Sequence, residues 1–85
     1  MESIKGKVRE YLVAELNLPI SQEELQDDTP LLSSRLIDSI SALLLVEFLE
    51  KEYKIEFKPH EVNHDNLDSL DLIANFVEGK QQEHA

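Results

Sequence analysis

Apolar residues recur at helical spacing near the start of the 85-residue chain. Within residues 3–16 one falls at every fourth position, which is the spacing of one helix face. This stripe consists of Ile4, Val8, Leu12 and Leu16, with Tyr11 beside it. Asn17 and Pro19 are typical of the end of a helix. The pattern therefore predicts an amphipathic helix over residues 3–16.

Residues 39–53 show the strongest helical pattern in the chain. They are rich in good helix formers and contain neither Gly nor Pro. We expect the buried stripe of this helix to consist of Leu45, Val46, Leu49 and Tyr53, with Leu43 beside it. Leu44 falls outside this stripe, and we expect its side chain to be exposed.

A closing helix is predicted over residues 69–78, and Gly79 is expected to end it. Its inward side chains are Leu70, Ile73, Phe76 and Val77. Before this helix, Pro59 can start a short helical turn that continues to Asn63. These patterns together predict three main helices and one short helix.

Residues 17–37 form a long connection between the first two helices. The expected core anchors of this loop are Leu25, Leu31 and Leu32. Loops longer than about 12–15 residues are uncommon in compact domains and are often functional. We predict an all-α fold, a small bundle of three main helices plus one short helix, with the long loop between the first two. We expect residues 1–85 to form a single domain, with a core at about 3–78 and a flexible tail at 79–85.

Acidic residues outnumber basic residues by 18 to 8, which gives a formal net charge of −10. Such a field repels nucleic acid and anionic membranes, and it attracts basic protein surfaces. The same charge also aids solubility. The charge therefore permits a role in docking basic partners without establishing one.

The sequence contains no cysteine, which excludes a disulfide framework and thiolate metal ligands. No run of about 18 apolar residues could span a membrane, and the first residues lack the apolar stretch of a signal peptide. These features favour a cytoplasmic protein. With the charge, we expect a monomer that binds neither nucleic acid nor membranes.

Ser39 stands where the long loop meets the predicted helix over residues 39–53, between Asp38 and Ile40. Serine is a favoured N-cap residue, so the simplest interpretation is that its hydroxyl caps free amides of the helix. A hydroxyl at this end is also exposed, and the positive end of the helix dipole favours a phosphate placed on it. The tripeptide by itself leaves both interpretations open.

The residues around Ser39 resemble the signature of a known family. Thr-Pro-Leu-Leu at 29–32 and Leu-Ile-Asp-Ser-Ile at 36–40 are similar to the segment that contains the Asp-Ser-Leu motif of acyl and peptidyl carrier proteins. The helices that follow also correspond, so the resemblance covers roughly residues 3–78. The chain thus resembles a discrete, free-standing member of the phosphopantetheine-binding carrier family.

This resemblance implies a carrier that has no catalytic residues and no metal site of its own. A separate phosphopantetheinyl transferase, using magnesium and coenzyme A, would attach 4′-phosphopantetheine covalently to Ser39, with Asp38 as the adjacent motif residue. The terminal thiol of this arm would carry acyl or aminoacyl groups as thioesters from a loading enzyme to a downstream synthase. An imported thiol also agrees with the absence of cysteine.

The sequence departs from the family pattern at two places. Many relatives have a glycine a few residues before the serine, where this chain has Arg35 and Leu36. Fatty-acid carriers usually bear acidic residues just after the serine, where this chain has Ser41 and Leu44. We therefore expect a secondary-metabolite pathway, polyketide or nonribosomal peptide. The alternatives are a fatty-acid carrier and an unmodified helical interaction module.

Partner enzymes are expected to dock on the outward face of the helix that follows the attachment serine. Ile40, Leu44 and Glu47 lie outside the buried stripe of this helix and close to its start. These three residues form the predicted partner interface.

A second Asp-Ser pair at 68–70 matches the family tripeptide more closely than the pair at 38–40 does. Only a short helix is predicted to follow it, in contrast to the long helix after Ser39. Ser69 is therefore expected to cap the closing helix and to carry no arm.

The segment from His60 to His64 spells the His-Glu-x-x-His pattern of zinc proteases. That chemistry needs both histidines on one helix, a third protein ligand and a substrate cleft. Here the pattern lies on a short turn in a small chain. We therefore expect neither a metal site nor protease activity.

Overall fold

The computed structural model describes residues 3–83, and the regular elements in this range are all helical. In chain order they are α1 (Ile4–Glu10), the π-helical turn η1 (Tyr11–Glu15), α2 (Ser39–Tyr53), the 3₁₀ turn η2 (Pro59–Glu61), α3 (His64–Leu67) and α4 (Leu70–Glu83). The predicted all-α class is confirmed, as is the long gap between the first two main helices. Among the residues described, no helix combines the length and the apolar character needed to cross a membrane.

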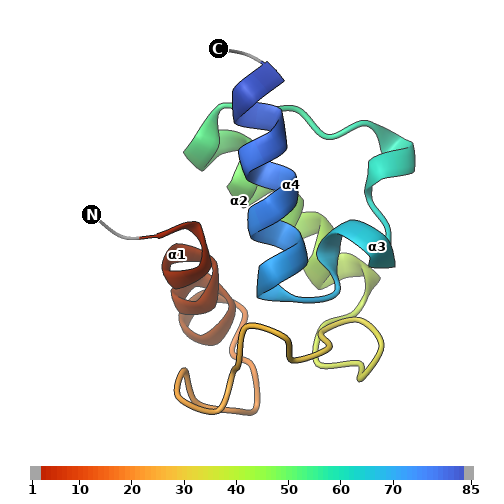
Figure 1. Cartoon of the computed structure of the whole chain (residues 1–85). Coiled ribbons are helices and arrows are strands. Elements are labelled where there is room, and N and C mark those ends of the chain that lie inside the picture. Colours follow the sequence, from red (N-terminus) through yellow and green to blue (C-terminus); the bar gives the residue numbers. More distant parts are fainter. Residues whose placement is uncertain (1–2, 84–85) are drawn as a thin grey trace.

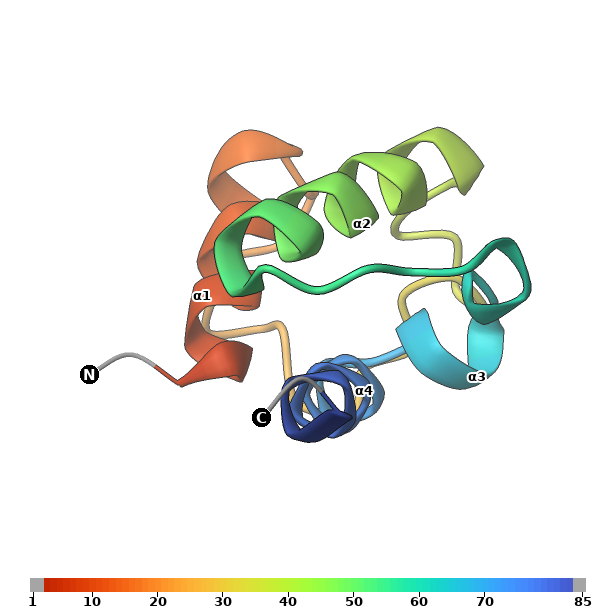
Figure 2. The ribbon, with the colours of Figure 1, turned by 90° about the horizontal axis from the view of Figure 1, so that it is seen from above.

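Helix α4 contacts each of the other three α-helices and lies at the centre of the bundle. In Figure 1 it crosses in front of α2, with α1 on one side and α3 on the other. Seen from above in Figure 2, α4 is viewed along its axis and α2 extends across the opposite layer. The apolar core fills the space between these layers.

The first predicted helix is present, but its second half is wider than an α-helix. Helix α1 begins after Ser3, whose hydroxyl accepts a hydrogen bond from the backbone N–H of Gly6. From Tyr11 the chain continues as the π turn η1, closed by the backbone N–H of Leu16 donating to the Tyr11 carbonyl at 3.3 Å. The Tyr11 ring stacks on Phe48 of α2 with ring centres 4.1 Å apart, which joins this turn to α2.

Helix α2 has the predicted bounds and buries Leu45 and Leu49 completely. The expectation for Leu43 was wrong, because its side chain is 55% exposed. At 3.6 residues per turn, Leu43 lies about 160° around the helix from Leu45 and so faces away from the core. The helix ends at Lys54, which adopts a left-handed backbone conformation with φ of 54°.

The closing helix does not end at Gly79, as the sequence predicted, but continues to Glu83. The predicted tail is therefore helical over 79–83, and its last two residues lie outside the described range. A glycine costs a helix only about 1 kcal/mol, which tertiary contacts can offset. Here Lys80 lies against the core, with its ammonium 2.9 Å from Glu61 and 5.5 Å from the centre of the Phe76 ring. These contacts hold the helical turn that follows the glycine.

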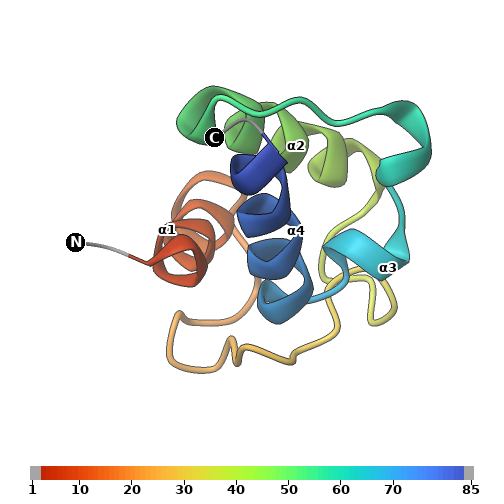
Figure 3. The same cartoon turned by 45° about the horizontal axis from the view of Figure 1, so that its top comes forward.

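The long loop over residues 17–37 is hydrogen-bonded to the helical part of the domain in both its first and its second half. Figure 3 shows it passing across the end of the bundle at which α4 begins. In its first half, the Arg9 guanidinium donates to the Leu25 carbonyl and to the Asp27 carboxylate, and the backbone N–H of Asp71 donates to the Asp27 carbonyl. Leu25 and Leu31 are buried as predicted. The loop is thus an ordered part of the domain.

The second half of the loop is held by Asp68, at the junction of α3 and α4. One oxygen of its carboxylate accepts hydrogen bonds from the backbone N–H groups of Leu32 (2.8 Å) and Ser33 (2.9 Å), and the other accepts from the Ser33 hydroxyl (2.6 Å). The Asp68 carbonyl also accepts from the backbone N–H of Leu31 at 2.6 Å. Desolvation would raise the pKa of Asp68, but these hydrogen bonds outweigh it and hold the pKa below its ordinary value.

The variant Asp68→Asn should lower the free energy of unfolding at neutral pH by about 1–3 kcal/mol, because a neutral amide weakens three charge-assisted hydrogen bonds. Since the folded-state pKa of Asp68 is depressed, its contribution is complete above about pH 4 and disappears as the pH falls through the lower folded value. In urea melts between pH 7 and pH 3, the difference in stability between the two proteins should therefore narrow towards the acid end.

Asp65→Asn is the matched control, since Asp65 is an exposed carboxylate three residues earlier on α3. It should change stability by less than about 0.5 kcal/mol. A stability gap for Asp68→Asn that is constant with pH would contradict this account.

Candidate functional site

Ser39 is the first residue of α2, and its side chain is exposed. The capping interpretation of Ser39 is wrong, because Asp38 is the N-cap residue. The Asp38 carboxylate accepts a hydrogen bond from the backbone N–H of Ser41 at 2.8 Å, and its carbonyl accepts from Ala42 at 2.9 Å. Since Asp38 caps the helix, the Ser39 hydroxyl is not used to bind the free amides at the start of α2.

Asp38 is held ionised by the start of the helix that it caps. The hydrogen bond from the backbone N–H of Ser41, assisted by the Ser41 hydroxyl, lowers the pKa of Asp38. A negative charge at this end also interacts favourably with the helix dipole. The neighbour of Ser39 is therefore a fixed carboxylate.

Among the serines of the chain, Ser39 is the one whose hydroxyl has no hydrogen-bond partner within the described residues. Each of the other six hydroxyls is engaged with a backbone group or a carboxylate. These six belong to Ser3, Ser21, Ser33, Ser34, Ser41 and Ser69. Ser39 is thus distinguished from the other exposed serines by its lack of a hydrogen-bond partner.

The competing Asp-Ser pair has a structural role, as predicted. The Ser69 hydroxyl accepts a hydrogen bond from the backbone N–H of Leu72 at 3.2 Å, just before α4 begins at Leu70. Ser69 is only 8% exposed. Its oxygen is therefore buried and already bonded, whereas the Ser39 oxygen is neither.

The three residues of the predicted interface are all exposed on α2. Ile40 is 71% exposed and Leu44 is 42% exposed, and the Glu47 side chain is also exposed. Their spacing of four and three residues places them on one face. Beside Leu44 and Glu47 lies a hollow of about 560 Å³, whose lining includes Tyr11 and Phe48. This face therefore combines apolar side chains, a carboxylate and a concave neighbouring surface.

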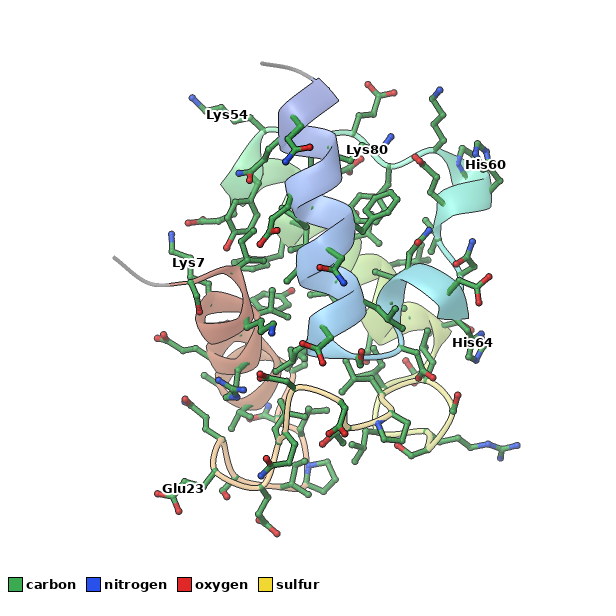
Figure 4. The ribbon with its side chains drawn as sticks, viewed as in Figure 1. Lys7, Glu23, Lys54, His60, His64 and Lys80 are labelled. Carbon is green, nitrogen blue, oxygen red and sulfur yellow. The ribbon has the colours of Figure 1, made fainter. Side chains whose placement is uncertain are left out.

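The two histidines of the zinc-protease pattern belong to different elements. His60 lies in the 3₁₀ turn η2, and His64 is the first residue of α3. Figure 4 shows the two side chains at separate places on the surface. Glu61 between them accepts from the backbone N–H of Lys58 and pairs with Lys80, which lowers the pKa of Glu61. In the part of the chain that the structure describes, no group of three potential ligands is placed to hold a metal ion.

Two structural features next to Ser39 were not predicted from the sequence. One is a cavity of about 250 Å³ that Ser39 and His64 both line, although they are 25 positions apart in the sequence. The other is Arg35, whose φ of 65° lies in the left-handed region. Only a residue such as glycine adopts this region without strain. The left-handed turn gives a physical reason for the glycine that resembling carriers have a few residues before the serine, and that signal was present in the sequence.

The comparison with known families agrees with this geometry. The family model described as "phosphopantetheine attachment site" matches residues 6–74, which is most of the chain. No curated protein matches the chain. The chain therefore belongs to the phosphopantetheine attachment family, whose members carry 4′-phosphopantetheine covalently on a conserved serine. An exposed, unbonded serine at the start of a 15-residue helix fits this group.

The backbone strain at Arg35 can be tested by replacing this residue with glycine. Arg35→Gly should be more stable than Arg35→Ala by about 1 kcal/mol, because both variants lose the side chain and only glycine relieves the left-handed strain. Urea melts of the two variants measure this difference. Equal stabilities would show that this turn carries no strain.

Proposed function

We propose that Ser39 is the residue to which the phosphopantetheine arm is attached. The observation that carries this proposal is that Ser39 alone among the described serines has a hydroxyl without a hydrogen-bond partner. In the transfer, the Ser39 oxygen forms a bond to the phosphorus that bears pantetheine in coenzyme A. The bond from that phosphorus to 3′,5′-adenosine bisphosphate breaks, and the hydroxyl proton passes to a base of the transferase.

The protein then acts as an acyl carrier, with acyl or aminoacyl groups held as thioesters on the arm. Carrier domains of this family are generally non-catalytic and interact with a phosphopantetheinyl transferase and with acyl-handling enzymes. We expect this chain to have no catalytic role and to work as a monomer between a loading enzyme and a downstream synthase. Because coenzyme A supplies the arm inside the cell, we place this function in the cytoplasm.

The pathway that we favour is the synthesis of a polyketide or a nonribosomal peptide. The support comes from the residues just after Ser39, where fatty-acid carriers usually have acidic side chains. In this chain the Ser41 hydroxyl is directed to the Asp38 carboxylate, and the exposed Leu44 presents an apolar surface. A partner suited to this face needs an apolar contact at Leu44 as well as a basic group for Glu47.

Attachment at Ser39 is tested by intact-mass measurement after incubation with a broad-specificity transferase, magnesium and coenzyme A. The wild-type protein and Ser69→Ala should gain one phosphopantetheinyl unit, and Ser39→Ala should gain none. Loading that survives the loss of Ser39 would refute the assignment. If no protein is loaded, the unmodified interaction module becomes the better description.

The interface on α2 is tested by Leu44→Glu. We expect about a tenfold decrease in kcat/KM for loading by the transferase, which corresponds to a loss of about 1.4 kcal/mol of binding in the transition state. Leu72→Glu is the matched control, because Leu72 is an exposed leucine on α4. An unchanged rate for Leu44→Glu, or an equal decrease for Leu72→Glu, would contradict the proposed interface.

A further inference from the structure

The cavity beside Ser39 lies between the start of α2 and the segment that contains α3. Most of its lining is apolar and comes from Leu32, Ala42, Leu43, Val62 and Leu67. Its polar lining residues are Ser39, Asn63 and His64. An arm attached to the Ser39 oxygen therefore begins at the edge of a mainly apolar cavity that also contains two other polar groups.

Of these two polar groups, Asn63 is already engaged. Its side-chain carbonyl accepts a hydrogen bond from the backbone N–H of Asn66 at 3.1 Å, and its amide donates to the His60 carbonyl at 2.7 Å. His64 is different, because its exposed imidazole makes no hydrogen bond within the described residues. His64 is therefore the lining side chain that can donate to a new group at Ser39.

The charges around the cavity favour the same residue. A phosphodiester at Ser39 bears one negative charge, and it would lie next to the ionised Asp38. Among the residues that the structure describes, no lysine or arginine lines this cavity, and His64 is the one lining residue that can become positively charged. Figure 4 places His64 on α3 and His60 farther along the surface, on η2.

From this arrangement we infer that His64 is a positioning residue for the arm. Its protonated imidazole binds the phosphate on Ser39 and keeps the first part of the arm against the apolar lining of the cavity. This role rests on the proposed attachment at Ser39. It adds a specific phosphate contact that is supplied by the segment between α2 and α4.

The test uses ³¹P NMR of the loaded full-length protein, with His64→Gln and the matched control His60→Gln. His60 is an exposed histidine four positions earlier, and it does not line the cavity. The phosphodiester resonance of the wild-type protein and of His60→Gln should shift with pH and show one inflection, as the imidazole beside the phosphate gains its proton. His64→Gln should lose this inflection while remaining loaded. In the wild-type protein, nuclear Overhauser effects should also connect the His64 ring protons to the geminal methyl groups of the arm.

The outcomes separate this inference from the proposed function. Loading on Ser39 without a pH inflection, or with one that persists in His64→Gln, overturns the role of His64 and leaves the carrier function standing. An inflection that is lost in His60→Gln also overturns it. Failure of Ser39 to be loaded overturns both proposals.

Discussion

The Asp68 carboxylate holds the loop in the position from which α2 can begin. It accepts three hydrogen bonds from residues 32–33, and the Asp68 carbonyl accepts a fourth from Leu31. These bonds join the loop to the junction of α3 and α4, 36 positions away in the sequence. From there only a few residues lead to Asp38 and Ser39. The segment that leads into Ser39 is therefore held by a residue that comes 29 positions after this serine in the sequence.

The two Asp-Ser pairs of this chain show how the same two residues serve opposite purposes. In the first pair, Asp38 caps α2 and so releases the Ser39 hydroxyl. In the second pair, Asp68 is turned towards the loop, and the Ser69 hydroxyl must satisfy the start of α4 itself. Which residue of a pair caps the helix decides whether its serine is available. The match to the family tripeptide favours the second pair as the attachment site, whereas the hydrogen bonding of the two serines favours the first.

Local features of the fold were predictable, and distant contacts were not. The bounds of α2 follow from an unbroken run of helix formers after Asp38, because helix propensity and the cap act within the segment itself. The end of α4 was predicted wrongly because the contact of Lys80 with Glu61 crosses 19 positions and outweighs the tendency of Gly79 to end a helix. The exposed position of Ser39 could be expected from its place at a helix start. Its lack of a hydrogen-bond partner could not, because that depends on which side chain caps the helix.

Several distinct properties meet at the first turns of α2, and each has its own physical cause. Asp38 fixes a negative charge there, and the strained turn at Arg35 leads the chain into the helix. Ile40 and Leu44 project apolar side chains that stay exposed on that face. An enzyme that approaches the hydroxyl of Ser39 must therefore contact an apolar strip and a carboxylate at the same time. A surface that matches both is far more selective than one that responds to the overall charge of −10 alone.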